Sequence, residues 1–266
     1  MPKLYFVKMG GSVITETNVP NTAKEEEIKR ILSEIEQLRR TKKANFVIGH
    51  GSGSFGHMAA KEYRTNEGII NDRSLVGAGI TKLAANALNS IVIKVGTSMN
   101  IPVFPFSASS FGVSREKSIV AGFARNIKMA LRKGFVPVVY GDVMIDTKQG
   151  VSIAPTEEIF RFLAPKLKPD CIVLGTDVDG VYDKDPTLNA DAKLVAEIDS
   201  SNIDRIMKST DGARKIDVTG GMRSKVALLH EIVKTNGCTG YITNIGRVGA
   251  LSEIVSGNKN CTIVRP

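Results

Sequence analysis

The sequence predicts an α/β fold, a three-layer αβα sandwich with a mainly parallel central sheet. Short apolar runs of strand length alternate along the chain with longer segments of helical periodicity, which is the pattern of repeated βαβ units. Several of the apolar runs also end in glycine-rich turns, and ligands of such sheets bind beyond the carboxyl ends of the strands. We therefore expect a single domain over residues 1–266, with its site at those strand ends.

Strands are expected where apolar residues run without interruption between turn residues. These runs are LYFVKM (4–9), NFVIGH (45–50), IPVFPF (101–106), FVPVVYGDV (135–143), CIVLGT (171–176), GYITN (240–244) and CTIVRP (261–266). VMID and VSIA flank TKQG, and this arrangement predicts a hairpin.

Helices are expected at 23–40, 74–99, 114–132 and 221–234. Within the first helix, apolar residues recur at helical spacing, at Ile28, Ile31, Leu32, Ile35 and Leu38. In the second, the candidate core positions are Leu75, Ile80, Leu83, Leu88, Ile91 and Val95. Three of these, Leu83, Leu88 and Ile91, are also candidates for an apolar ligand wall.

The composition is that of an ordinary globular protein, with 42% hydrophobic and 24% charged residues in 266. No apolar run reaches the roughly 18 residues that span a bilayer, and the apolar stretch near residue 4 is too short for a signal peptide. We expect a cytoplasmic protein without a membrane partner. Cys171, Cys238 and Cys261 lack metal-ligand spacing and are expected to be buried thiols.

The formal net charge of +9 suits a polyanionic partner, an anionic small molecule or a simple solvated surface. Lysines and arginines are scattered along the chain, and no aromatic residues alternate with them. Nucleic-acid-binding surfaces combine clustered positive charge with stacking aromatics. The sequence therefore predicts no nucleic-acid partner.

Three glycine-rich segments suggest phosphate binding: KMGGS (8–12), HGSGSFGH (50–57) and DVTGGMRSK (217–225). Glycines let backbone N–H groups approach a phosphate closely, and a helix N-terminus favours an anion. Each segment alone is equally consistent with a tight turn or a helix start. Together, with Lys8 and Lys225 beside two of them, they indicate a polyphosphate held between several turns. Neither a P-loop (G-x-x-x-x-G-K-[ST]) nor a dinucleotide-binding G-x-G-x-x-G in its proper context is present.

KMGGS, GTDVDGVYDKDP (175–186) and DVTGGMRSK resemble the amino acid kinase superfamily. Within it, HGSGSFGH, VPVVYGDV (136–143) and GTDVDGVY resemble the isopentenyl phosphate kinase family, from residue 3 to the C-terminus. The resemblance implies the amino acid kinase fold, with ATP on the C-terminal half and the acceptor on the N-terminal half. It implies phosphorylation of isopentenyl phosphate to isopentenyl diphosphate, a step of isoprenoid biosynthesis. The alternatives are a kinase for another small phosphate or phosphonate and a non-catalytic ligand-binding paralogue.

The resemblance also implies the site residues. The catalytic residues are Lys8, His57 and Lys225. The nucleotide-binding residues are Lys8, Gly10, Gly11, Ser12, Gly53, Asp177, Asp179, Tyr182, Lys184, Gly221 and Lys225. The substrate-binding residues are Ser52, Gly53, Ser54, Gly56 and His57.

The chemistry of the acceptor supports these assignments. A phosphate acceptor already carries a nucleophilic oxygen, so the site needs hydrogen-bond donors and positive charge more than a general base. An imidazole donor suits a phosphate, which favours His57 as the residue that selects the acceptor class. His50 is expected to be structural, and His230, inside the last long helix, is not expected to be catalytic.

ATP is the expected phosphoryl donor, and Mg²⁺ is expected to be held mainly through phosphates, with no protein ligand predicted. Superfamily resemblance also implies a homodimer built through the sheet and its early helices.

Two positions depart from the family pattern. Thr17 stands where relatives carry a lysine, and SIAPTEEIF replaces a Ser-Gly-Asp segment whose aspartate orients the catalytic lysines, so that Glu157 or Glu158 is the candidate substitute. Both changes bear on the rate and on the identity of the acceptor.

Overall fold

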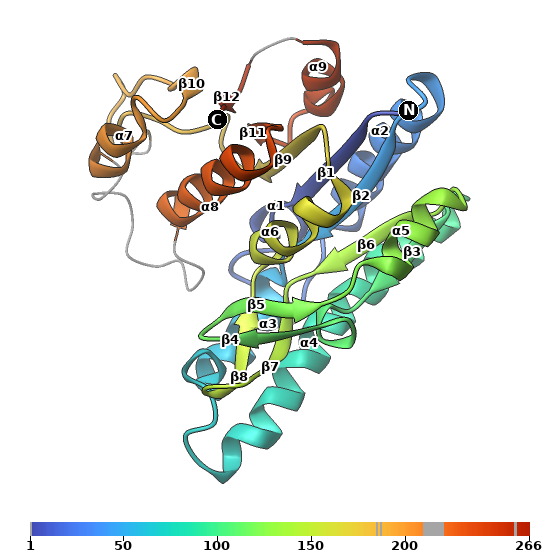
Figure 1. The fold of residues 1–266 in the computed structure, drawn as a ribbon, viewed down its shortest axis with the longest axis vertical. Coiled ribbons are helices and arrows are strands. Elements are labelled where there is room, and N and C mark those ends of the chain that lie inside the picture. The colour runs from blue at the N-terminus through green and yellow to red at the C-terminus, as the bar shows by residue number, and fades with distance from the viewer. Residues whose placement is uncertain (1, 185, 187, 210–220, 258–259) are drawn as a thin grey trace.

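The computed structural model describes residues 2–184, 186, 188–209, 221–257 and 260–266. Its main sheet has eight strands in the order β10-β12-β11-β9-β1-β2-β6-β3 (Figure 1). Their bounds are β1 Leu4–Met9, β2 Asn45–His50, β3 Val103–Phe106, β6 Val136–Tyr140, β9 Cys171–Thr176, β10 Glu197–Ile198, β11 Thr239–Asn244 and β12 Thr262–Val264. Neighbouring strands run parallel except β11 and β12. The predicted mainly parallel sheet is confirmed.

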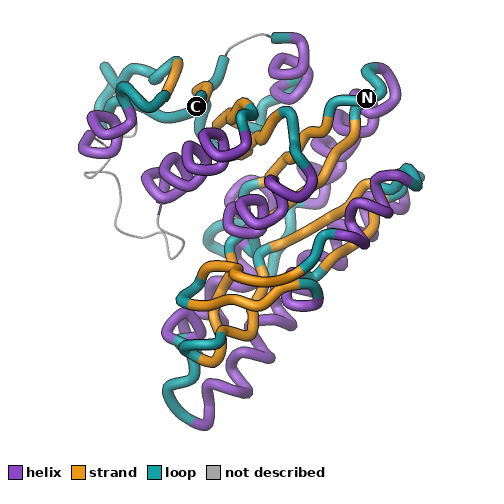
Figure 2. The backbone as a smooth tube through the Cα atoms, in the orientation of Figure 1, coloured by secondary structure: helices purple, strands orange, loops and turns teal. Residues whose placement is uncertain are grey.

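Helices cover both faces of this sheet (Figure 2). They are α1 Gly11–Ile14, α2 Glu25–Thr41, α3 Gly53–Glu62, α4 Asp72–Ser98, α5 Arg125–Arg132, α6 Thr156–Leu167, α7 Ile203–Ser209, α8 Gly221–Asn236 and α9 Ala250–Ser256, with short 3₁₀ turns η1 Thr65–Glu67 and η2 Ala108–Ser110. One core packs α2, α4 and α9 against the sheet, and the other packs α5, α6 and α8. Side chains of β1 alternate between them, Tyr5 and Val7 in one and Phe6 in the other. Three layers result, as predicted.

Helix α2 matches its prediction closely. All five apolar positions proposed for it are at most 4% exposed, because they form a single stripe facing the sheet. The cysteines also agree with the prediction in the main: Cys238 and Cys261 are buried and Cys171 is half-buried, all as free thiols.

Helix α4 matches in extent but differs from the prediction in its faces. Leu88 and Val95 are buried, whereas Leu75 and Leu83 are 61% and 68% exposed, and Ile80 lies outside as well. The inner face near α3 carries small residues instead. A Cβ added at Gly77 would lie 2.4 Å from the Cβ of Tyr63, so larger side chains do not fit there.

Among the described helices, α4 alone is long and apolar enough to cross a membrane by length and composition. In this fold, part of α4 is buried in the core shared with α2 and the main sheet.

A second sheet of four strands, β5-β4-β7-β8, lies beside the carboxyl ends of the main sheet (Figure 1). Its strands are β4 Gly112–Arg115, β5 Ser118–Gly122, β7 Asp142–Asp146 and β8 Gly150–Ala154. The predicted hairpin is confirmed as β7–β8. The fourth predicted strand is divided, with β6 in the main sheet and β7 in this one.

The helix predicted over 114–132 is wrong in its first half, which forms the β4–β5 hairpin. Glu116 and Lys117 have φ values of +51° and +69° at the turn. The carboxylate of Asp146 accepts hydrogen bonds from both of their N–H groups, at 3.2 and 2.9 Å. This distant partner stabilises a left-handed turn that the local apolar spacing did not indicate. Helix is formed only from Arg125 to Arg132.

Candidate active site

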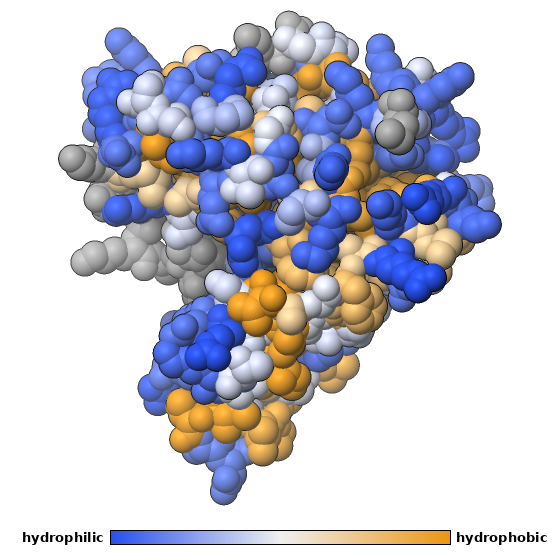
Figure 3. Space-filling view, in the orientation of Figure 1, coloured by the Kyte–Doolittle hydropathy of each residue, from blue (hydrophilic) through white to orange (hydrophobic). Residues whose placement is uncertain are grey.

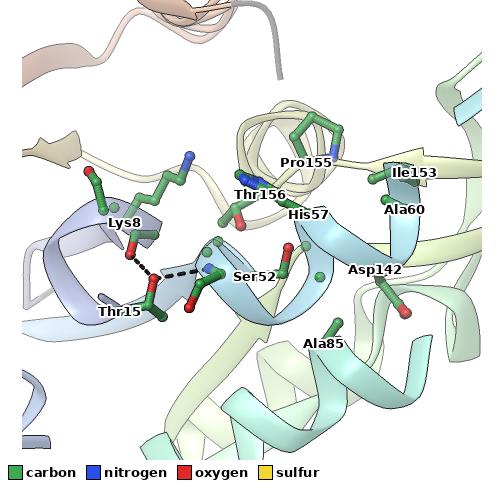
Figure 4. A pocket seen from close by; sticks show the side chains of 18 of the residues that line it. Lys8, Thr15, Ser52, His57, Ala60, Ala85, Asp142, Ile153, Pro155 and Thr156 are labelled. Carbon is green, nitrogen blue, oxygen red and sulfur yellow. Dashed lines mark hydrogen bonds between the residues drawn. The ribbon is translucent and has the colours of Figure 1, made fainter. Parts of the chain in front are cut away.

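A cavity of about 1060 Å³ opens at the carboxyl ends of β1, β2 and β9. Because these strands are parallel neighbours, the turns that follow them meet at one edge of the sheet. Most of the predicted site residues line this cavity (Figure 4): Lys8, Gly10, Gly11, Ser12, Ser52, Gly53, Ser54, Gly56, His57, Asp177 and Lys225.

Four predicted nucleotide-binding residues do not line the cavity: Asp179, Tyr182, Lys184 and Gly221. Tyr182 pairs with Leu194 in an isolated β-bridge, and the Lys184 ammonium lies 2.6 Å from an oxygen of Asp191. Gly221 begins α8, and residues 217–220 of its motif lie outside the described residues. The role of these residues in nucleotide binding stays a prediction.

The glycine-rich turns contact each other directly through their backbones. A Cβ added at Gly10 would lie 2.6 Å from the carbonyl oxygen of Gly175, and one added at Gly11 would lie 2.8 Å from the Cα of Gly53. Gly53 also has a φ of +47°, which disfavours other residues. The glycines therefore serve close packing between the turns as well as access to the cavity.

Not every N–H group of the second turn is available to a ligand, contrary to the expectation from its sequence. Ser54 N–H donates to Thr15 Oγ1, and the N–H groups of Phe55 and Gly56 donate to the carbonyl of Ser52. Within the described part of the chain, the N–H groups of Ser52 and Gly53 are the ones left for an anion. The buried Ser54 hydroxyl has no partner in the described structure, so it too is a candidate donor to a bound phosphate.

Lys8 and Glu157 form a buried ion pair at the cavity. Burial would raise the pKa of Glu157, but the Lys8 charge and then the Lys225 charge outweigh it and hold that pKa below its ordinary value. Glu158 instead binds Arg161 at 2.6 Å and accepts the N–H of Ile119 at 2.6 Å. Of the two acids considered as substitutes for the family aspartate, Glu157 is the one that contacts a predicted catalytic lysine.

His57 lies on α3 with its imidazole toward the cavity (Figure 4). His50, by contrast, is fully buried, with its ring nitrogens 2.9 Å from Gly51 O and 3.2 Å from Asn89 Oδ1. Burial lowers the pKa of His50, so it stays neutral. His230 lies on α8 and does not line the cavity. His57 is thus the histidine that lines the cavity among the described residues, and its role toward the acceptor stays a prediction.

The small or β-branched side chains of Ala60, Ala85 and Ile153 lie at the end of the cavity beyond His57 (Figure 4), and those of Thr81 and Val143 also line the cavity. Helix α4 contributes Thr81 and Ala85 to it, and the predicted wall of Leu83, Leu88 and Ile91 is wrong. Leu88 points into the core, and Leu83 points to solvent.

Asp142 borders this end of the cavity and was missed as a site residue, although it lies within VPVVYGDV. Its carboxylate accepts hydrogen bonds from Lys82 Nζ at 2.6 Å, Ser107 Oγ at 2.6 Å and Ser109 N–H at 2.9 Å. This network joins α4 to the start of β7 and so holds in place the side chains that line this end of the cavity.

Thr17, where the family resemblance implies a lysine, lines the cavity. Among the described residues, the lysines on the cavity surface are Lys8, Lys117 and Lys225. Lys117, which was not predicted, is carried by the β4–β5 turn. No cluster of three or more His, Cys, Asp or Glu that could hold a metal ion occurs in the described residues.

Comparison with known proteins agrees with this geometry. Residues 3–244 match the family model described as the amino acid kinase family. The isopentenyl phosphate kinase of Methanocaldococcus jannaschii is 34% identical, with 96% of this chain and 95% of that protein covered. That of Thermoplasma acidophilum is 35% identical over 84% of each chain. A crystal structure of isopentenyl phosphate kinase superimposes with a TM-score of 0.82 and 29% identity, covering 99% of this chain and all of that one. This chain therefore belongs to the amino acid kinase family.

Proposed function

We propose that this protein transfers the γ-phosphate of ATP to the phosphate of isopentenyl phosphate, giving isopentenyl diphosphate and ADP. The observation that carries the proposal is the cavity in which the glycine turns after β1 and β2 touch. Lys8 and Lys225 lie there with His57 and a small apolar pocket. Full-length relatives bear the name isopentenyl phosphate kinase, and a structure described as the substrate complex of that enzyme has a TM-score of 0.81.

The reaction brings two anions together. An oxygen of the acceptor phosphate forms a bond to the γ-phosphorus of ATP while the bond to the oxygen bridging the β- and γ-phosphates breaks. Lys8 and Lys225 would offset the negative charge on the transferring group. Glu157 holds the Lys8 ammonium in place by their ion pair. The lowered pKa of Glu157 keeps this partner ionised at neutral pH.

The acceptor phosphate would lie between the two glycine turns. His57, the N–H groups of Ser52 and Gly53 and the hydroxyl of Ser54 would donate hydrogen bonds to it. The groups of Ser52, Gly53 and Ser54 lie at the start of α3, whose N-terminus also favours an anion, and His57 lies about one turn further along the helix. The acceptor oxygen is already nucleophilic, so none of these groups needs to remove a proton.

The hydrocarbon tail of the acceptor would occupy the pocket between α3, α4 and β8. Its lining by Ala60, Ala85, Val143 and Ile153 suits a short branched apolar group. We propose that Mg²⁺ is held through the phosphates, since Mg²⁺ keeps several waters and uses few protein carboxylates. The exposed Asp177 is the carboxylate on the nucleotide side of the cavity.

A kinase for another small phosphate or phosphonate is the second candidate, favoured by Thr17, which stands in the cavity where the family resemblance implies a lysine. A coupled ADP-release assay with isopentenyl phosphate, dimethylallyl phosphate, a phosphonate analogue and uridine monophosphate separates the two. We expect the highest kcat/KM with isopentenyl phosphate. A higher value with a different phosphate would replace the proposed acceptor, and no ADP release with any of them would favour a non-catalytic role.

We also propose a homodimer. The outer face of α4 carries Leu75, Val76, Ile80 and Leu83, all exposed, on a helix whose inner face is apolar too. Figure 3 shows apolar surface at the end of the molecule where α4 lies. A helix that is apolar on both faces is normally covered on both. Light scattering at micromolar concentration should give a mass twice that of the 28.7 kDa chain, and the Leu83→Glu variant should give the mass of a single chain. A monomeric mass for the unmodified protein would contradict the proposal.

A further inference from the structure

Thr15 is a buried polar side chain between the two glycine turns, and none of the sequence motifs includes it. It is 1% exposed and follows the four-residue helix α1. Its hydroxyl donates to the carbonyl of Gly11 at 2.8 Å and accepts the N–H of Ser54 at 3.1 Å. Figure 4 draws both hydrogen bonds. One hydroxyl thus joins the turn after β1 to the turn after β2.

The packing around this hydroxyl leaves little freedom. A Cβ added at Gly53 would lie 2.2 Å from Thr15 Oγ1 and 3.0 Å from the Gly11 carbonyl oxygen. The backbone N–H of Thr15 also donates to Gly11 O, at 3.0 Å. The two turns therefore approach as closely as their backbones allow, and the threonine sets the position of one against the other.

We propose that Thr15 is a positioning residue, which fixes the distance between the turn that holds the transferring phosphate and the turn that holds the acceptor. The inference rests on the proposed function, because it assigns the two turns to the two phosphates. The hydroxyl also engages the Ser54 N–H. The acceptor phosphate is thereby directed to the neighbouring N–H groups of Ser52 and Gly53 and to the hydroxyl of Ser54.

Loss of this bridge should lower the rate of transfer more than the binding of either substrate. In-line transfer requires the reacting atoms within a narrow range of distance, and small misplacements cost rate steeply. Each turn keeps its own ligand-binding groups when Thr15 is changed. Removing the hydroxyl should therefore lower kcat by about 10- to 100-fold, with a much smaller change in either KM.

Three variants separate the hydroxyl from the shape of the side chain. Thr15→Val keeps the branched shape without the hydroxyl, Thr15→Ala removes both, and Thr15→Ser keeps the hydroxyl alone. Steady-state kinetics should show low kcat in the valine and alanine variants and most of the activity in the serine variant. Ser114→Ala is the matched control. That buried hydroxyl also bridges two segments, to Ile145 O at 3.0 Å and Ser152 Oγ at 2.7 Å, but away from the cavity.

The outcomes are distinct. Wild-type kcat in Thr15→Ala and Thr15→Val would overturn the inference, and so would an equal loss of kcat in Thr15→Ser. A fall in melting temperature with unchanged kcat would show a merely structural threonine, as expected for Ser114→Ala. If the unmodified protein prefers a different phosphate, the proposed acceptor fails. The same comparison made with that phosphate still tests Thr15.

Discussion

Glu157 is a carboxylate buried beside two predicted catalytic lysines, and its ionisation links stability to pH. Burial opposes its charge, but Lys8 and then Lys225 hold its pKa below the ordinary value. A carboxyl group with a lowered folded-state pKa contributes stability above its unfolded pKa and loses that contribution as the pH falls through the folded value. The ion pair with Lys8 should therefore persist at neutral and mildly acidic pH.

Glu157→Gln should remove the charged partner of Lys8 in their buried ion pair. We expect the free energy of unfolding to fall by about 3–5 kcal/mol at pH 7, and kcat to fall with it. Urea denaturation at several pH values checks this. The difference between the two proteins should shrink as the pH falls below the ordinary carboxyl range. A difference that stays constant with pH would contradict the role of the charge.

Lys225 lies on α8 at the cavity and contributes to the electrostatics of Glu157. Lys225→Ala should lower kcat by about 10²- to 10³-fold, as removal of one preorganised donor does elsewhere, and should raise KM much less. Lys234→Ala is the matched control, because Lys234 is an exposed lysine in the last turn of the same helix. Equal kcat values for the two variants would show that Lys225 is a surface lysine with no role in phosphoryl transfer.

His57 is predicted to select the acceptor by donating to its phosphate. A hydrogen bond to a charged group contributes about 1.5–3 kcal/mol, so His57→Ala should lower kcat/KM by about 10- to 150-fold. His57→Gln, which keeps an N–H donor, should retain more activity. Calorimetry should give nearly unchanged ATP affinity for both variants. Full activity of His57→Ala on every phosphate tested would refute the assignment.

The turn of the β4–β5 hairpin is stabilised by one distant carboxylate. Four backbone N–H groups, from Glu116, Lys117, Lys148 and Gln149, donate to Asp146. Burial opposes the charge of Asp146, but these donors hold its pKa far below the ordinary value. Its contribution to stability is therefore fully present at neutral pH and declines as the pH falls from the unfolded carboxyl pKa toward the lower folded value.

Asp146→Asn should lower the free energy of unfolding by about 1–3 kcal/mol at pH 7, because an amide cannot accept all four hydrogen bonds. Thermal denaturation at neutral pH measures it. Glu116→Gln is the control: the side chain of Glu116 forms an exposed ion pair with Lys148 of the β7–β8 turn, so the loss of its charge should change the melting temperature little. Equal shifts for the two variants would contradict the capping role.

Local patterns predicted the elements that are stabilised locally or by one apolar stripe. Helix α2 and the strands of the main sheet other than the two-residue β10 follow from their sequences, since buried parallel strands read as continuous apolar runs. The β4–β5 hairpin could not be predicted in this way, because its turn depends on Asp146, about thirty residues away. The faces of α4 were misassigned because its inner side must be small to meet α3, which reverses the usual pattern.

At the scale of the whole molecule, parallel pairing explains why most predicted site residues converge. The turns after β1 and β2 were visible in the sequence as glycine-rich, and the sheet brings them together with the turn after β9. Thr15 and Asp142 were missed because each acts through backbone or side-chain partners that only the fold supplies. A local signal for Thr15 did exist: it follows Gly11 by four residues, one helical turn away.

Phosphorus NMR of the complete reaction tests the central claim most directly. The unmodified protein is incubated with ATP, Mg²⁺ and isopentenyl phosphate, and with ATP and Mg²⁺ alone. The account predicts that the phosphomonoester signal is replaced by the two coupled signals of a diphosphate ester. ADP should form in equal amount, and only when the acceptor is present. Release of inorganic phosphate at the same rate with and without isopentenyl phosphate, or an unchanged monoester signal, would contradict it.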